Sequence, residues 1–156
     1  MDTARLRAEI TALAKNYYVA RNTELQAYEL RDFHYPEGWV LRDRRRWQRH
    51  PGVPRGPPYV APLLVRIPDS YPYSQPYAYI PRSLEYTEGR VTHLLTKTPD
   101  PAWLPWCVRD LDWDPAEHNI PWLLGLLQVA FSHPDVPDPT SHLAVSRPED
   151  YRAPQR

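Results

Sequence analysis

Proline occupies 20 of the 156 positions in this chain, and it restricts where regular structure can form. Because proline lacks a backbone N–H and fixes φ, it is disfavoured in helix interiors and in the inner strands of a sheet. A high proline content alone is typical of disorder, but the chain also has 11 tyrosines and 6 tryptophans. Burial of these large rings offsets the entropy lost on ordering the chain. We therefore predict a compact fold whose loops are set by proline.

The charge balance narrows the classes of partner. The 19 basic and 19 acidic residues cancel, so no overall field favours nucleic acid or an anionic membrane. The first residues, "MDTARLRAEI", have no apolar core of a signal peptide, and no stretch approaches the roughly 18 apolar residues of a spanning helix. We expect a cytoplasmic, soluble single domain over residues 1–156, with a proline-rich tail from about residue 133 and neither nucleic acid nor membrane as partner.

Helical periodicity occurs near both ends of the chain. A first amphipathic helix is predicted for residues 2–20, with Asp2 or Thr3 as its cap. A second is predicted for residues 119–131, where proline at position 121 fits the first turn. The apolar stripe of the first helix consists of Leu6, Ile10, Leu13 and Tyr17.

Strand-like alternation lies between the two helices. Residues 24–33 and 39–47 are predicted to form a hairpin, because "HYPEG" between them supplies a turn. The segment 59–67 is the most apolar strand candidate, and Pro62 within it implies an edge strand or a bulge. A short strand is predicted at 76–80. The order is typical of an α+β domain with a four-stranded antiparallel meander between terminal helices.

Residues 81–118 show little periodicity and are predicted to form a long irregular region that contains Cys107. A single cysteine excludes an internal disulfide. It is either a small buried hydrophobe or a nucleophile, and a nucleophile requires partial exposure. The histidines have no paired ligand spacing and no Cys-x-x-Cys is present, so neither a metal nor a bound cofactor is predicted.

Several landmarks share their order with one enzyme family. "VRIPDSYPYSQPYAYI" (65–80) is followed by His93, "WCVRDL" around Cys107, "WDPA" (113–116), the apolar helix, "HPD" (133–135) and "SRPEDYR". Over about residues 59–151 this order resembles ubiquitin-conjugating enzymes. The resemblance implies the UBC-like fold, with an N-terminal helix, a four-stranded meander, a long active-site loop and a C-terminal helix.

The resemblance also implies a reaction. Cys107 would carry a protein C-terminus as a thioester and pass it to a lysine amine, after an activating enzyme has used ATP upstream. His93 would organise the loop before Cys107 or, alternatively, serve as its base. Asp135 would position the attacking lysine, or belong only to a turn cluster. The Tyr-Pro pair at 71–72 and the 113–116 loop would meet partner proteins, or serve as ordinary packing.

The chain departs from the family pattern at one important place. "THLLT" stands where the family has His-Pro-Asn, so the asparagine that supports attack on the thioester is missing. This resembles divergent bacterial members found in ubiquitin-like modification or antiphage defence operons. There the cargo is a ubiquitin-like protein or the C-terminus of a cyclic-nucleotide synthase, and the acceptor is a protein. The alternative is a catalytically inactive binding module of the same fold, which holds a ubiquitin-like protein or a proline-rich peptide.

Overall fold

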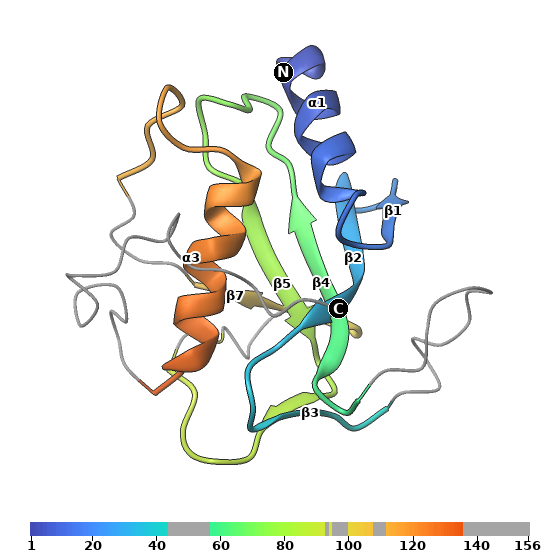
Figure 1. Cartoon of the computed structure of the whole chain (residues 1–156), viewed down its shortest axis with the longest axis vertical. Coiled ribbons are helices and arrows are strands. Elements are labelled where there is room, and N and C mark those ends of the chain that lie inside the picture. The colour runs from blue at the N-terminus through green and yellow to red at the C-terminus, as the bar shows by residue number, and fades with distance from the viewer. Residues whose placement is uncertain (44–56, 93, 95–99, 108–111, 136–156) are drawn as a thin grey trace.

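The computed structural model of the protein describes residues 1–43, 57–92, 94, 100–107 and 112–135. Within these residues the chain is an α+β fold with two helices, a five-stranded antiparallel sheet and a separate two-stranded sheet (Figure 1). The helices are α1 (Thr3–Leu13) and α3 (Ile120–Ser132). The larger sheet has the spatial order β1 (Val19–Asn22), β2 (Ala27–His34), β4 (Val60–Arg66), β5 (Tyr77–Pro81) and β7 (Trp103–Trp106). The smaller sheet pairs β3 (Trp39–Leu41) with β6 (Leu84–Tyr86).

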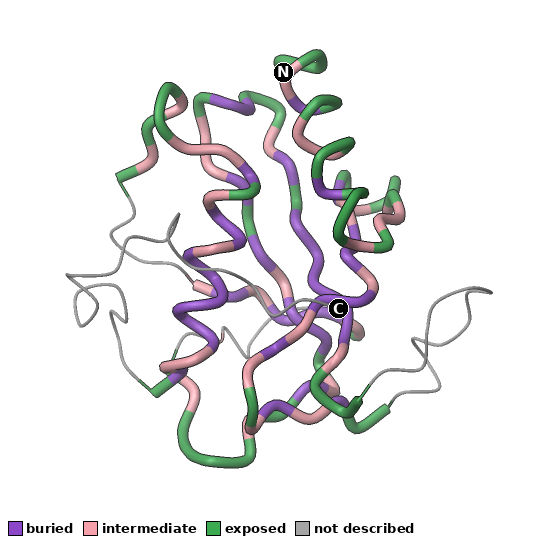
Figure 2. Tube along the Cα trace, in the orientation of Figure 1, coloured by how far each residue is buried: buried purple, intermediate pink, exposed green. Residues whose placement is uncertain are grey.

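The second predicted helix is confirmed as α3. The Asn119 side chain caps it by accepting a hydrogen bond from the Trp122 amide at 2.8 Å, and Pro121 lies in the first turn, where a missing N–H costs nothing. Most of the helix is buried against one face of the larger sheet, as the purple segments of Figure 2 show.

The first helix is shorter than predicted. Asp2 is the N-cap, as expected, and accepts a hydrogen bond from the Arg5 amide at 3.0 Å. The helix ends at Leu13, and Val19–Asn22 form strand β1 on the edge of the sheet. The predicted helix extended too far because Tyr17 continues the helical spacing, whereas the aromatic and β-branched residues beginning there favour a strand.

The strands predicted at 59–67 and 76–80 are confirmed as β4 and β5. Pro62 predicts either an edge strand or a bulge. The edge strand is wrong, because β4 lies between β2 and β5, and the bulge is correct. The pairing of β2 with β4 shifts between Leu30↔Leu63 and Phe33↔Ala61, so two residues of β2 stand opposite Pro62. This irregularity accommodates a residue without an N–H inside the sheet.

The predicted hairpin is wrong. β2 pairs with β1 and β4, whereas β3 leaves the larger sheet and pairs with β6. The turn before β3 contains Gly38 at φ +100, a backbone conformation that favours glycine, and its carbonyl accepts hydrogen bonds from both the amide and the hydroxyl of Thr87 at 2.8 Å. The conformation of this turn is therefore fixed by contacts with residues that are distant in the sequence. The last part of the strand predicted at 39–47 lies outside the described residues.

The region 81–118 is more regular than predicted, because it contains β6 and β7. The missed strand β7 is only four residues long and includes Pro105, which counts against a strand by sequence. It lies at the edge of the sheet beside β5, where a residue without an N–H is tolerated. The consequence for the candidate site is that Cys107 directly follows an edge strand.

An aromatic cluster fills the core between α3 and the sheets. Phe131 of α3 packs edge-on against Trp106 of β7, with ring centroids 4.7 Å apart, and lies 4.9 Å from the Tyr35 ring. Trp39 donates a hydrogen bond from Nε1 to the Phe131 carbonyl at 2.8 Å, which satisfies a carbonyl in the last turn of the helix. The cluster therefore anchors both α3 and the strand that leads into Cys107.

Candidate functional site

Cys107 is half-buried and follows Trp106 at the end of β7. Cys107 as a residue thus has the partial exposure that is expected of a nucleophile. The preceding residue, Trp106, is fixed by its pairing with Ala78 and by its contact with the Phe131 ring. The backbone that presents Cys107 therefore has rigid support on its N-terminal side.

Three separate candidate segments meet near the end of β7. Leu94 forms an antiparallel bridge with Trp106, the residue before Cys107. Thr92 donates hydrogen bonds from its amide and its hydroxyl to the Pro134 carbonyl, at 3.0 and 3.3 Å. The two neighbours of His93 thus contact the strand that ends at Cys107 and the turn that contains Asp135. His93 itself lies outside the described residues.

Asp135 is exposed. Burial raises the pKa of Tyr86 above its ordinary value, and the negative charges of Glu88 and Asp135 raise it further. The charge of the Asp135 carboxylate therefore acts on the Tyr86 phenol, as does that of Glu88.

The Tyr-Pro turn and the Trp-Asp-Pro-Ala loop, for which the sequence allows partner binding or ordinary packing, lie in contact. Trp113 donates a hydrogen bond from Nε1 to the Pro72 carbonyl at 2.7 Å, and its ring centroid lies 6.4 Å from that of Tyr71. On its other side Trp113 contacts the ring of His118, which stacks on Trp122 at 3.9 Å. The two loops therefore form one aromatic unit at the N-terminal end of α3.

Glu9 is the residue of this region that the sequence did not reveal. Its Oε2 accepts hydrogen bonds from the Tyr71 hydroxyl at 2.5 Å and from the Ile120 amide at 2.9 Å. Its Oε1 accepts one from Arg5 Nε at 2.8 Å, and the same guanidinium donates to the carbonyls of Pro115 and His118. One carboxylate thus joins α1, the Tyr-Pro turn and α3. In the sequence it is visible only as an i,i+4 partner of Arg5, which predicts a solvent-exposed helix pair.

Alkaline pH should destabilise the protein through its buried tyrosines. Burial raises the pKa of Tyr71 above the ordinary value of 10.0, and the hydrogen bond to Glu9 and its negative charge raise it further. Burial also raises the pKa of Tyr35. A tyrosine whose pKa is higher in the folded than in the unfolded state stabilises the fold fully below about pH 10, which is its pKa in the unfolded chain. As the pH rises above that value, the free energy of unfolding falls by up to about 1.4 kcal/mol per pH unit for each such tyrosine.

The measurement is urea unfolding at about pH 9 and about pH 11. Tyr71→Phe should lose about 1.4 kcal/mol less than the wild type between these two pH values, because one titrating group has been removed. Tyr73→Phe is the matched control, since the Tyr73 side chain is 80% exposed, and it should behave like the wild type. If Tyr71→Phe and the wild type lost the same free energy of unfolding between these two pH values, the raised pKa of Tyr71 would be contradicted.

The chain matches no protein-family model, no curated protein and no solved structure. The resemblance to ubiquitin-conjugating enzymes therefore depends on the sequence landmarks and on what the described residues do around them. Within the described residues, no group of three or more His, Cys, Asp or Glu side chains is placed to hold a metal ion. In the same part of the chain, neither helix is both long and apolar enough to cross a membrane.

Proposed function

We propose that the protein is a ubiquitin-conjugating-type transferase that carries a protein C-terminus as a thioester on Cys107 and passes it to a lysine. The cargo is a ubiquitin-like protein or the C-terminus of a cyclic-nucleotide synthase, delivered by an activating enzyme, in a bacterial modification or antiphage defence pathway. No cofactor is required at Cys107, because ATP is used upstream. The UBC-like fold is part of this proposal.

The convergence at the end of β7 carries the proposal. The segments that contain the three candidate residues are far apart in sequence, yet the contacts of Thr92 and Leu94 bring them together beside the only cysteine of the chain. Half-burial of Cys107 suits a thiol that must be reached by a large acyl donor and then by an amine. The contact of Trp113 with Pro72 further supports the proposal, because both loops belong to the resemblance.

The chemistry has two steps, both at the sulfur. In the first, the Cys107 thiolate attacks the activated carbonyl carbon of the cargo, a C–S bond forms, and the donor's leaving group departs. In the second, a lysine amine attacks the same carbon, a C–N bond forms, and the thiolate leaves as the amine loses a proton. A thiolate serves both as a good nucleophile and as a good leaving group.

A binding module is the second candidate, and one exposed side chain favours it. Tyr73 is 80% exposed and follows Pro72 on the aromatic unit that Trp113 completes. Large exposed rings beside proline turns are suited to hold extended peptides. The missing asparagine of the "THLLT" segment also favours this candidate, whereas the position and partial exposure of Cys107 favour the enzyme.

The test is whether Cys107 carries an acyl group that reducing agent releases. The wild-type protein is isolated from its native host, with the activating enzyme and ATP present, and its mass is compared with and without a thiol reductant. A mass increase that reduction removes supports the transferase. If no adduct is found, the transferase is contradicted and the binding module is the remaining candidate.

Asp135→Ala should separate the two steps. Because the proposed role of the carboxylate is to orient the incoming amine, charging of Cys107 should proceed as in the wild type. Discharge to lysine should slow by at least about tenfold, the size expected for loss of a hydrogen bond to a charged group. The measurement is single-turnover charging and discharge, each followed on non-reducing gels.

Glu88→Ala is the matched control for this substitution. It removes the other carboxylate that acts on Tyr86, and it has no proposed role in transfer. Discharge by this variant should stay close to the wild-type rate. Equal loss of charging and discharge in Asp135→Ala would instead indicate that the turn at Pro134 has been disrupted.

A further inference from the structure

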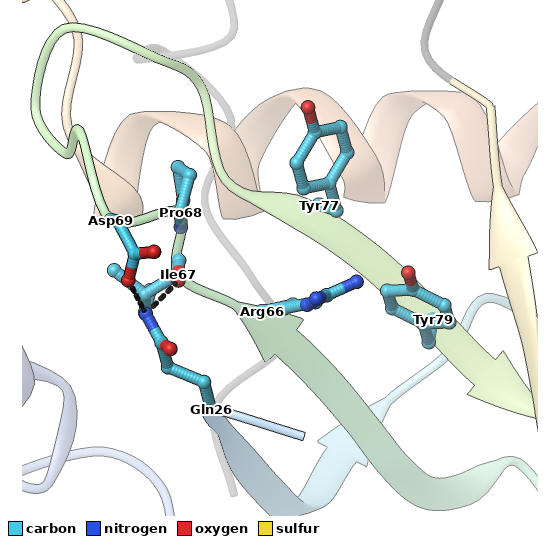
Figure 3. A pocket seen from close by; sticks show the side chains of 7 residues that line it. All are labelled: Gln26, Arg66, Ile67, Pro68, Asp69, Tyr77 and Tyr79. Atoms are coloured by element: carbon cyan, nitrogen blue, oxygen red, sulfur yellow. Dashed lines mark hydrogen bonds between the residues drawn. The ribbon is translucent and has the colours of Figure 1, made fainter.

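A pocket of about 430 Å3 opens on the face of the larger sheet that is turned away from α3 (Figure 3). It lies at the ends of β4 and β5. The pairing of β5 with β7 ends at Ala78↔Trp106, one residue before Tyr77 on the β5 side is reached. The pocket is lined by Gln26, Arg66, Ile67, Pro68, Asp69, Tyr77 and Tyr79.

One wall combines a guanidinium with two phenol rings. Arg66 is exposed and pairs directly with Tyr77, which is 51% exposed, and Tyr79 lies two residues further along the same face of β5. Figure 3 shows the Arg66 side chain extending from β4 toward Tyr79. None of these three side chains makes a hydrogen bond, ion pair or ring contact with any residue that the structure describes. The wall therefore offers a cation for an anionic group and two rings for a flat apolar one.

The other wall is fixed by a hydrogen-bonded side chain. Gln26 has a left-handed backbone, φ 51, and donates from Nε2 to the Ile67 carbonyl at 3.0 Å and to Asp69 Oδ1 at 2.7 Å. The Asp69 carboxylate is held in place, forms no ion pair with Arg66, and keeps acceptor capacity toward the pocket. A ligand that fits both walls needs an anion at one end and hydrogen-bond donors at the other.

We propose that this pocket binds a nucleoside monophosphate. The phosphate pairs with Arg66, the base packs on the rings of Tyr77 and Tyr79, and the amino or hydroxyl groups donate to Asp69. The volume lies in the range of small-molecule sites, and the largely polar lining excludes a lipid chain. This assignment does not rest on the proposed transfer by Cys107.

The test is calorimetric titration of the full chain with AMP, adenosine and ribose 5-phosphate. AMP should bind saturably. Adenosine lacks the anion and ribose 5-phosphate lacks the base, so each should bind at least about tenfold more weakly, the factor for one lost charged hydrogen bond or one lost stacking contact. Absence of saturation at about 5 mM AMP would overturn the proposal, as would equal binding of AMP and either fragment.

Two variants and two controls locate the site. Arg66→Gln should weaken AMP binding at least about tenfold, and Tyr77→Ala about fivefold or more. Both side chains are exposed, so circular dichroism melting should show that the fold is retained. Arg7→Gln and Tyr73→Ala change exposed residues outside the pocket and should leave AMP affinity unchanged. If Arg7→Gln weakened AMP binding as much as Arg66→Gln, the binding would be non-specific charge attraction, and the proposed site would be wrong.

Discussion

Glu9→Ala is expected to lower the free energy of unfolding by about 3–5 kcal/mol, as is typical when one partner of a buried ionic and hydrogen-bonded group is removed. Only 11% of the Glu9 side chain is exposed. Tyr71 and Ile120, which both donate to this carboxylate, are fully buried. After the substitution their donors lie where water does not readily replace the lost acceptor.

The expected loss is large because Glu9 joins three parts of the fold. Arg5 loses its carboxylate partner at the same time, although it keeps its hydrogen bonds to the carbonyls of Pro115 and His118. Glu9→Gln should lose less than Glu9→Ala, since an amide oxygen still accepts one of the hydrogen bonds. Urea unfolding followed by far-UV circular dichroism measures all three proteins.

Glu85→Ala provides the matched control on the surface. Glu85 pairs with Arg42 at 2.6 Å, but the two side chains are 59% and 58% exposed. Ion pairs in water contribute little, so this substitution should cost less than about 1 kcal/mol. If Glu9→Ala costs no more than Glu85→Ala, the carboxylate does not hold the two helices and the Tyr-Pro turn together.

The parts of the fold that the sequence predicts are those whose signals are local. The helix at 120–132 has its cap at Asn119, a proline in the first turn and an apolar face, and the structure differs by one residue at each end. β4 and β5 are apolar enough to be recognised despite Pro62. The α+β class follows from these elements and from the first helix.

The errors occur where distant contacts outweigh the local pattern. Trp39–Leu41 reads as the second strand of a hairpin, but its partner is β6, more than 40 positions further along the chain, and Trp39 is held by the Phe131 carbonyl. β7 is too short and too rich in proline to be recognised, and it forms because β5 offers a free edge. Neither pairing leaves a signal within a window of a few residues.

The candidate site divides in the same way. Cys107 is conspicuous in the sequence, and Asp135 follows from the landmark order. Glu9 and Arg66 carry no such signal, because Glu9 reads as half of an exposed helix pair and Arg66 as a single charged residue in an apolar strand. Their places depend on the packing of α1 against α3 and on the register of β4 with β5. Side chains assembled by tertiary contacts become recognisable only in the folded structure.

Cys107→Ser is expected to convert a transient adduct into a stable one. A thioester is labile because thiolate leaves readily, whereas the same acyl group on serine forms an oxyester with a much poorer leaving group. The serine variant, expressed in the native host with its neighbouring genes intact, should accumulate a covalent complex. That complex should resist thiol reductant, which releases the wild-type adduct, and should be cleaved by mild alkali.

The size of the effect and its controls make the result decisive. Transfer to lysine should fall by at least about a thousandfold in Cys107→Ser and in Cys107→Ala, since both remove the thiolate. Only the serine variant retains an oxygen that can be acylated, so Cys107→Ala should carry no adduct. Serine is the weaker nucleophile, and loading should therefore be slow and partial. Mass spectrometry of the trapped complex should show a C-terminal peptide of another protein joined to position 107, and that peptide distinguishes a ubiquitin-like cargo from a nucleotide synthase. If neither the wild type nor Cys107→Ser carries an acyl group when activating enzyme and ATP are present, the proposal of a transferase is wrong. The binding module is then tested on the aromatic unit around Trp113 and Tyr73.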